Sequence, residues 1–123
     1  MPHDLVIADV FRSTPFEGNQ LAVFYDAQGL SDRAMQAFAQ EINFAESTFV
    51  PPPTDPKYAC RVRIFTPKRE LLFAGHPTIG TAAVLAYLGR VKAETDGIVL
   101  EAGIGPVLME VRTSTNPAFI RLL

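Results

Sequence analysis

The sequence predicts an α+β domain in which a rolled sheet of strands surrounds one central apolar helix, with one amphipathic helix outside. Three observations support this prediction: an uncharged segment at 77–88, a helix with one apolar face after Ser31, and strand-like segments on both sides of these two. The 123 residues, of which 48% are hydrophobic and 20% charged, suit one ordinary globular domain. We therefore expect a single domain over 1–123.

The chain begins with two strand-like segments, DLVIADVF (4–11) and NQLAVFYD (19–26), both rich in Val, Leu, Phe and Tyr. The polar segment RSTPFEGN between them contains Pro and Gly and is typical of a loop. We expect two strands joined by this loop.

An amphipathic helix is predicted next, in GLSDRAMQAFAQEINF (29–44). Ser31 stands where an N-cap belongs, and Leu30 and Met35 are spaced to form a hydrophobic staple. The apolar residues that recur at helical spacing are Met35, Phe38, Ala39 and Ile42. This helix therefore belongs on the surface with one face against the core.

Prolines and alternation mark the middle of the chain. ESTFVPP (46–52) is typical of a short strand stopped by prolines, and PPPTDPK (51–57) of a rigid loop. YACRVRIFTP (58–67) alternates, which predicts one half-buried strand. Its buried face holds Cys60, Val62 and Ile64, whereas solvated positions are expected for Arg12, Arg61, Arg63, Lys68 and Arg69.

The uncharged segment 77–88 predicts a second helix, with Pro77 at its first position and Gly89 just past its end. Its apolar residues circle the whole helix, so we expect burial on every side. Twelve residues span about 18 Å, too short for a bilayer. Strands can surround it: a hairpin of GIVLEAG (97–103) and GPVLMEVRT (105–113), and a further strand in PAFIRLL (117–123).

Several classes of function are disfavoured by composition. The net charge of −2 and the absence of a Lys or Arg run argue against nucleic-acid and anionic-membrane partners. Cys60 is the only cysteine, so no internal disulfide can form, and His3 and His76 are the only histidines, which argues against a zinc site. The N-terminus lacks the basic region and long apolar core of a signal peptide, so we expect a cytoplasmic protein.

Two places carry candidate chemistry. The segment AGHPTIG puts Gly75, His76 and Thr78 around the amino end of the apolar helix, where unpaired backbone N–H groups can bind an anion; the alternative is a plain turn into a core helix. Glu46 in NFAESTFV is a candidate general acid or base with Ser47 beside it, the alternative being an ordinary surface carboxylate.

Two further residues have weaker cases. Asn19 follows Gly18 in the first loop and can reach a ligand through its amide, or it can simply serve a turn. Cys60 lies inside an expected strand, which favours an inert core thiol over a nucleophile. His3 receives no role.

Three segments, in this order and spacing, resemble the N-terminal half of the phenazine-biosynthesis isomerase-like (PhzF-like) family: DVFRSTPFEGNQLAV, LSDRAMQAFAQEINFAESTFV and RIFTPKRELLFAGHPTIGTAAVL. The resemblance implies half of a diaminopimelate epimerase-like fold. Each half of that fold is a sheet rolled around one apolar helix, and the active site lies in the cleft between the halves.

The resemblance also implies roles for residues. The family segment N-x-x-E-[ST]-[ST]-F matches 43–49, which makes Glu46 the residue that shuttles a proton. The AGHPT motif matches 74–78, so Gly75, His76 and Thr78 are expected to bind substrate, together with Asn19 and Ser47. The family's reaction implies no metal and no organic cofactor.

Family members are about twice as long, so the second half of the family fold is expected to be absent. We therefore expect an isomerase or epimerase module that acts on a small carboxylated metabolite as a homodimer or with a complementary second-half chain. The alternative is a non-catalytic half-domain that binds a small ligand or a separate partner chain.

Overall fold

The computed structural model describes residues 5–10, 19–91, 97–112 and 119–122, which form two sheets and two helices. The first sheet has the order β1-β2-β3-β5-β6, with β1 Val6–Val10, β2 Asn19–Phe24, β3 Glu46–Phe49, β5 Arg63–Phe65 and β6 Glu70–Leu71. The second has the order β4-β7-β8-β9, with β4 Cys60–Arg61, β7 Ile98–Ala102, β8 Gly105–Arg112 and β9 Phe119–Leu122. The helices are α1 Asp32–Ile42 and α2 Gly75–Tyr87.

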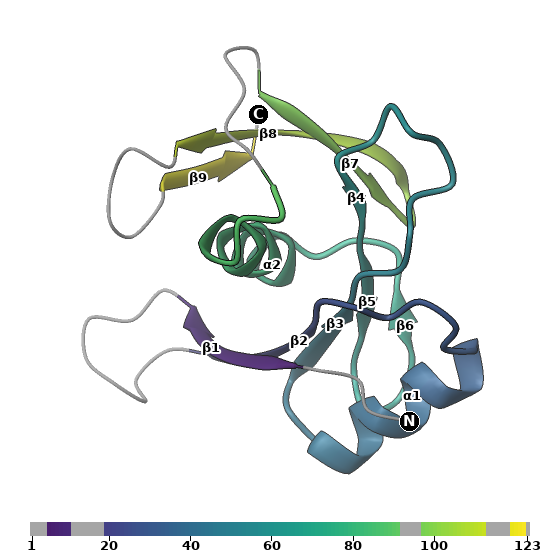
Figure 1. Cartoon of the computed structure of the whole chain (residues 1–123). Helices are drawn as coiled ribbons and strands as arrows, with labels where there is room; N and C mark the ends of the chain where they lie inside the picture. The colour runs from purple at the N-terminus through teal and green to yellow at the C-terminus, as the bar shows by residue number, and fades with distance from the viewer. Residues whose placement is uncertain (1–4, 11–18, 92–96, 113–118, 123) are drawn as a thin grey trace.

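The two sheets curl around α2, as Figure 1 shows, with β7–β9 on one side of the helix and β1–β3 on the other. The chain passes from one sheet to the other between β4 and β5, which only Val62 separates. The Val62 N–H still donates to the Glu101 carbonyl of β7 at 2.9 Å. The pairs β2–β3 and β4–β7 are parallel and the rest antiparallel. The α+β prediction of a rolled, mixed sheet around a central helix is confirmed.

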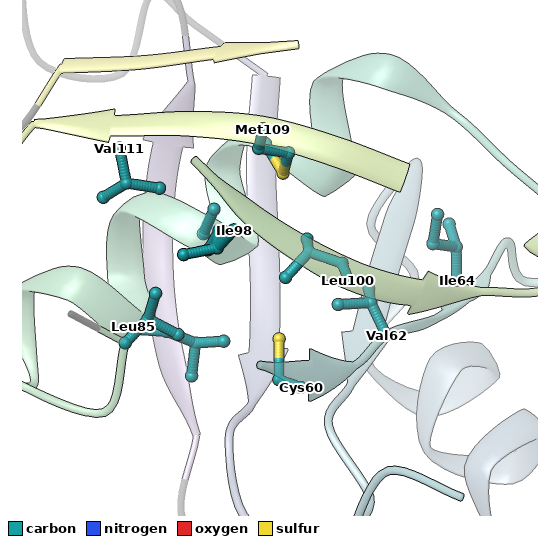
Figure 2. Packing of buried hydrophobic residues seen from close by; sticks show 10 residues of the cluster. Cys60, Val62, Ile64, Leu85, Ile98, Leu100, Met109 and Val111 are labelled. Carbon is teal, nitrogen blue, oxygen red and sulfur yellow. The ribbon is translucent and has the colours of Figure 1, made fainter. Parts of the chain in front are cut away.

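The segment predicted as one strand at 58–67 is therefore two strands, one in each sheet. The alternation itself holds, because Cys60, Val62 and Ile64 all lie in one buried cluster. Figure 2 shows this cluster between the second sheet and α2, with side chains from β7 and β8 meeting Leu85 of the helix. The two-residue strand β6 was not predicted.

Helix α1 matches its prediction. Ser31 is the N-cap and its Oγ accepts from the Ala34 N–H at 3.1 Å. Leu30 packs against the cluster that contains Met35. This cluster also contains three aromatic rings, of which Phe24 stacks on Phe49 at 4.5 Å and Phe49 meets Phe65 edge-on at 5.4 Å. The helix thus covers the face of the first sheet that points away from α2.

Helix α2 begins two residues earlier than predicted. Ala74 is its N-cap, so Pro77 takes the third helical position and not the first. The third N–H of a helix also lacks an intrahelical partner, so proline is tolerated there as well. Gly89 follows the helix with φ +74°, as predicted for the residue past the end.

Burial of α2 is greatest in its middle, whereas His76 in its first turn is exposed. The buried residues are Pro77, Thr78, Gly80, Thr81, Ala82, Val84 and Leu85. In the last turn Tyr87 is 86% exposed and Leu88 36%, so the expectation of burial on every side is wrong there. The sheets therefore enclose the helix between Pro77 and Leu85.

Arg63 also departs from its expected solvated position. Its side chain is 14% exposed, and its guanidinium forms a bidentate pair with Glu70 and a further bond to Asp32 at 2.6 Å. The predictions for Arg12 and His3 concern residues outside the described ranges.

Candidate functional site

Glu46 is the first residue of β3, and three observations show which face of the sheet it occupies. Thr48, two residues on, bonds to Thr81 of α2, with the two Oγ1 atoms 2.7 Å apart. Side chains two apart in a strand share a face. Leu21, the β2 partner of Glu46, packs with Val84 of α2. Half-buried Glu46 therefore lies on the α2-facing side of the sheet.

The position of Glu46 along α2 follows from the same strand. Beyond Thr48, Val50 lines a pocket with Leu85 and Val91, so β3 runs toward the carboxyl end of the helix. Glu46 thus lies about 6.6 Å back along the strand from Thr48, on the side away from that end.

That first turn has the features of an anion-binding helix end. Ala74 supplies no side-chain cap, and the Thr78 N–H makes a backbone bond to the Ala74 carbonyl at 3.3 Å. Gly75 and His76 come before Thr78 in the first turn, and His76 is exposed. The partial positive charge of a helix end attracts a carboxylate without any lysine.

Neither backbone nor packing requires glycine at position 75. Its φ lies outside the left-handed region, and a Cβ built there would meet Leu122 Cδ1 at 3.7 Å, an ordinary contact. Gly75 is half-buried, and without a side chain it allows a ligand to approach the backbone closely.

Asn19 begins β2, two residues before Leu21, the partner of Glu46. Because β2 and β3 are parallel, its backbone lies two residues beyond the level of Glu46 at the same end of the sheet. The structure therefore brings the backbones of Asn19 and Glu46 to the same end of the first sheet.

Two predicted binding residues are not brought to this surface. Ser47 is 0% exposed and, by alternation, on the opposite face of β3, with no hydrogen-bond partner for its Oγ in the described structure. Thr78 is 1% exposed, and its hydroxyl donates to the Ala74 carbonyl at 2.7 Å. Both side chains are held inside the fold.

Cys60 is 6% exposed, and burial raises the pKa of its thiol to about 12. It lies on the wall of a pocket of about 230 Å³, which Tyr25, Arg90 and the prolines 51–53 also line. This pocket is at the carboxyl end of α2 and contains none of the predicted site residues. The pocket therefore does not coincide with the predicted site residues. We take the amino end of α2 as the candidate site, because Gly75 and His76 lie there.

Within the described ranges no group of three His, Cys, Asp or Glu side chains is placed to hold a metal. Neither described helix is long and apolar enough to cross a membrane. Sequence reasoning missed the Thr48–Thr81 contact between β3 and α2. A polar residue inside an otherwise apolar helix was the available signal for Thr81.

A family model described as "Phenazine biosynthesis-like protein" matches residues 8–122. The trans-2,3-dihydro-3-hydroxyanthranilate isomerase of Pseudomonas aeruginosa is 46% identical over 105 residues, which are 85% of this chain and 36% of that protein. The crystal structure of a PhzF family phenazine biosynthesis protein of Bacillus anthracis is 29% identical with a TM-score of 0.84, over 98% of this chain and 40% of the other.

A hydroxyproline epimerase structure of Agrobacterium vitis, 12% identical with a TM-score of 0.64 over 87% of this chain and 36% of the other, shows the fold alone. The fold is diaminopimelate epimerase-like, as the resemblance implied. The chain spans less than half the length of the curated relatives it matches. With the family model matched over nearly all of its residues, this chain belongs to the phenazine biosynthesis-like (PhzF) family.

Proposed function

We propose that this chain is a half-module of a PhzF-like isomerase or epimerase that moves a proton on a small carboxylated metabolite in the cytoplasm, without metal or organic cofactor. The single observation that carries the proposal is the register of β3. The contact of Thr48 with Thr81 and the pairing of Glu46 with Leu21 support a Glu46 carboxylate on the α2-facing side of the sheet. In this proposal that carboxylate reaches the first turn of α2, so that a proton-transfer group and an anion-binding helix end are neighbours.

In this proposal the substrate carboxylate binds at the amino end of α2, near Gly75 and His76, and Asn19 lies at the edge of this binding site. Glu46 removes a proton from a carbon near that carboxylate, so a C–H bond breaks and a carboxyl O–H forms. The electron pair spreads into the substrate's conjugated system, which the helix end stabilises. Return of the proton to another carbon, or to the other face, completes isomerisation or epimerisation.

Ser47 and Thr78 make no direct contact with the substrate in this proposal. Thr78 supports the first turn through its bond to the Ala74 carbonyl. Ser47 fills the opposite face of the strand that carries Glu46. Their predicted roles thus become indirect.

The site needs a second wall, and we propose that a second copy of the chain or a complementary second-half chain supplies it. Leu72 and Ile104 are 65% and 60% exposed, and the Ile104 N–H donates to the Leu72 carbonyl at 3.2 Å. Leu72 lies three residues before Gly75. This Leu72–Ile104 patch offers an apolar contact beside the amino end of α2.

The alternative function is a non-catalytic half-domain that binds a ligand or a partner chain. The observation that favours it is coverage, since this chain spans 36% of the named isomerase. Groups that the rest of that protein would contribute are then missing from a lone copy.

The test is incorporation of solvent deuterium, with trans-2,3-dihydro-3-hydroxyanthranilate as the first probe and other small carboxylates after it. We expect the wild type to be a homodimer by native mass and to catalyse exchange. Glu46→Gln should lower the rate by about 10²–10⁴-fold, the usual contribution of a general acid or base. Exposed Glu41 on α1 provides the control, and Glu41→Gln should exchange like the wild type. A monomer without exchange on any tested carboxylate would support the non-catalytic alternative.

A further inference from the structure

Two fully buried hydroxyl groups join the strand that carries Glu46 to the helix that carries Gly75 and His76. Thr48 of β3 and Thr81 of α2 are both 0% exposed, and their Oγ1 atoms are 2.7 Å apart. Thr81 Oγ1 also lies 2.6 Å from the carbonyl oxygen of Pro77, in the first turn of the helix. These contacts form one chain of atoms from β3 to the amino end of α2.

The direction of this chain follows from the number of protons. The Pro77 carbonyl can only accept, and a hydroxyl has one proton to donate. Thr81 must therefore donate to Pro77, because two acceptor oxygens at 2.6 Å without a proton between them would repel each other. Thr48 is then the donor to Thr81. With these directions, each hydroxyl donates its one proton to an acceptor, Thr48 to Thr81 and Thr81 to Pro77.

The residues beside Thr48 on the sheet are apolar and do not require a polar side chain at this position. On the sheet, Thr48 lies between Val23 and Ile64, both nearly fully buried. Valine has the shape of threonine, so apolar residues would fill these positions equally well. A buried hydroxyl is costly unless it is bonded, so the net gain in stability from the pair is small. The Thr48–Thr81 hydrogen bond differs from an apolar contact in being directional. Apolar contacts allow the strand to slide against the helix, whereas a hydrogen bond favours one position.

We propose that Thr48 and Thr81 are positioning residues, which set the register of β3 against α2 and thereby hold Glu46 level with the first turn of the helix. This inference depends on the proposed function only in making Glu46 the proton-transfer group. Thr48 is two residues from Glu46 on the same face, and Thr81 is one turn from Pro77. A displacement of about 1 Å in such an arrangement can cost as much as 10²-fold in rate.

Four sets of variants separate positioning from stability. Thr81→Val leaves the Thr48 hydroxyl buried without its acceptor, so we expect the largest drop in unfolding midpoint. Thr48→Val leaves Thr81 bonded to Pro77 and should cost less. The double variant Thr48→Val/Thr81→Val removes both polar groups and should unfold nearer to the wild type than Thr81→Val does. Thr48→Ser/Thr81→Ser keeps both hydroxyls but loses two buried methyl groups, and serves as the matched control.

The deuterium exchange rate should then be lower in the Val/Val protein than in the Ser/Ser protein, although Val/Val is the better packed of the two. We expect the Val/Val protein to lose about tenfold or more in kcat with little change in KM, because Glu46 is displaced while the anion site is intact. The Ser/Ser protein should exchange within about threefold of the wild type although it is the less well packed. Equal rates for Val/Val and the wild type would overturn the proposal.

A second readout does not depend on activity. In isotope-labelled protein, nuclear Overhauser contacts between β3 and the first turn of α2 should be present in the wild type and the Ser/Ser variant and weakened in Val/Val. If these contacts change as expected while no protein exchanges any substrate, the proposed function fails and the register role stands. Unchanged contacts in Val/Val would reject the register role whether or not the wild type is an enzyme.

Discussion

At the scale of single residues, the Cys60 thiol combines a position on a pocket wall with an environment that suppresses its reactivity. It is 6% exposed, and burial raises the pKa from 9.0 to about 12. The thiolate is the reactive form, and the raised pKa leaves very little of it at neutral pH. We expect iodoacetamide to modify the native protein far more slowly than the urea-unfolded protein, as followed by mass spectrometry.

The control for this experiment is native protein held with iodoacetamide at low, non-denaturing urea. If labelling occurs only through unfolding, its rate should rise with urea as stability falls. Labelling of the native protein as fast as the unfolded chain would show that the pocket delivers reagents to the sulfur, contrary to the core role predicted for this residue.

The contrast between Cys60 and Ser47 shows which single-residue predictions a sequence can support. Cys60 stands in an alternating segment with charged neighbours, so its buried side could be read from the pattern. Ser47 stands between Glu46 and Thr48, where every residue is polar and alternation does not indicate a face. Contacts between residues far apart in the sequence, Thr48 with Thr81 and Leu21 with Val84, decide that Glu46 faces α2 and Ser47 does not.

At the scale of secondary-structure elements, a cluster of charges fastens α1 to the first sheet. Asp32 is the first residue of α1, and its carboxylate lies 2.6 Å from Arg63 of β5, which also binds Glu70 of β6. The hydrogen bond and the charge of Arg63 hold the pKa of Asp32 below its ordinary value. A carboxylate at the first turn of a helix also interacts favourably with the helix dipole.

This lowered pKa makes a prediction about pH. A carboxyl group whose pKa is lower in the folded state stabilises the fold fully above its unfolded pKa, here 3.8, and the contribution is lost as the pH falls through the lower native pKa. We expect Asp32→Asn to have a lower urea midpoint than the wild type at pH 7, with the difference vanishing at strongly acidic pH. The Asp32 side chain is 82% exposed, so the ion pair stabilises only modestly and the difference in midpoint should be small.

Half-buried Asp55 lies in the loop before β4, outside the cluster of Asp32, Arg63 and Glu70, and its carboxylate accepts from the Lys57 N–H at 2.9 Å. It provides the comparison carboxylate: the fall in midpoint with acid should persist in Asp55→Asn and be reduced in Asp32→Asn. If the Asp32→Asn deficit were the same at pH 7 and at strongly acidic pH, the ion pair would not be its cause.

Boundaries of elements were predicted less well than the elements themselves, for physical reasons. Proline is tolerated throughout the first turn of a helix, so Pro77 could not fix where α2 begins. A two-residue strand such as β6 shows no periodicity, and only its pairing with β5 defines it. The division of 58–67 at Val62 depends on curvature between two sheets, which an alternating pattern does not encode.

At the scale of the whole molecule, the fold could be predicted because one helix without charge must be enclosed by the strands around it. The same reasoning does not give the second wall of the site. The relatives have more than twice the length of this chain, so alternation and helix burial within it carry no information about a second wall.

The exposed apolar side chains allow the second wall to be located by experiment. Among the described residues, the most exposed large apolar side chains are Tyr87, Leu72 and Ile104. The last two form the patch beside the amino end of α2, whereas Tyr87 lies at its carboxyl end, which makes Tyr87 the natural control. If the second copy docks at the amino end, Leu72→Glu/Ile104→Glu should turn the dimer into a monomer in light scattering and abolish exchange, because charged groups would have to be buried in the contact. Tyr87→Glu should keep both the mass and the exchange of the wild type. A dimer that survives the first substitution and dissociates with the second would place the contact at the opposite end of the helix and leave the Glu46 site without the wall proposed for it.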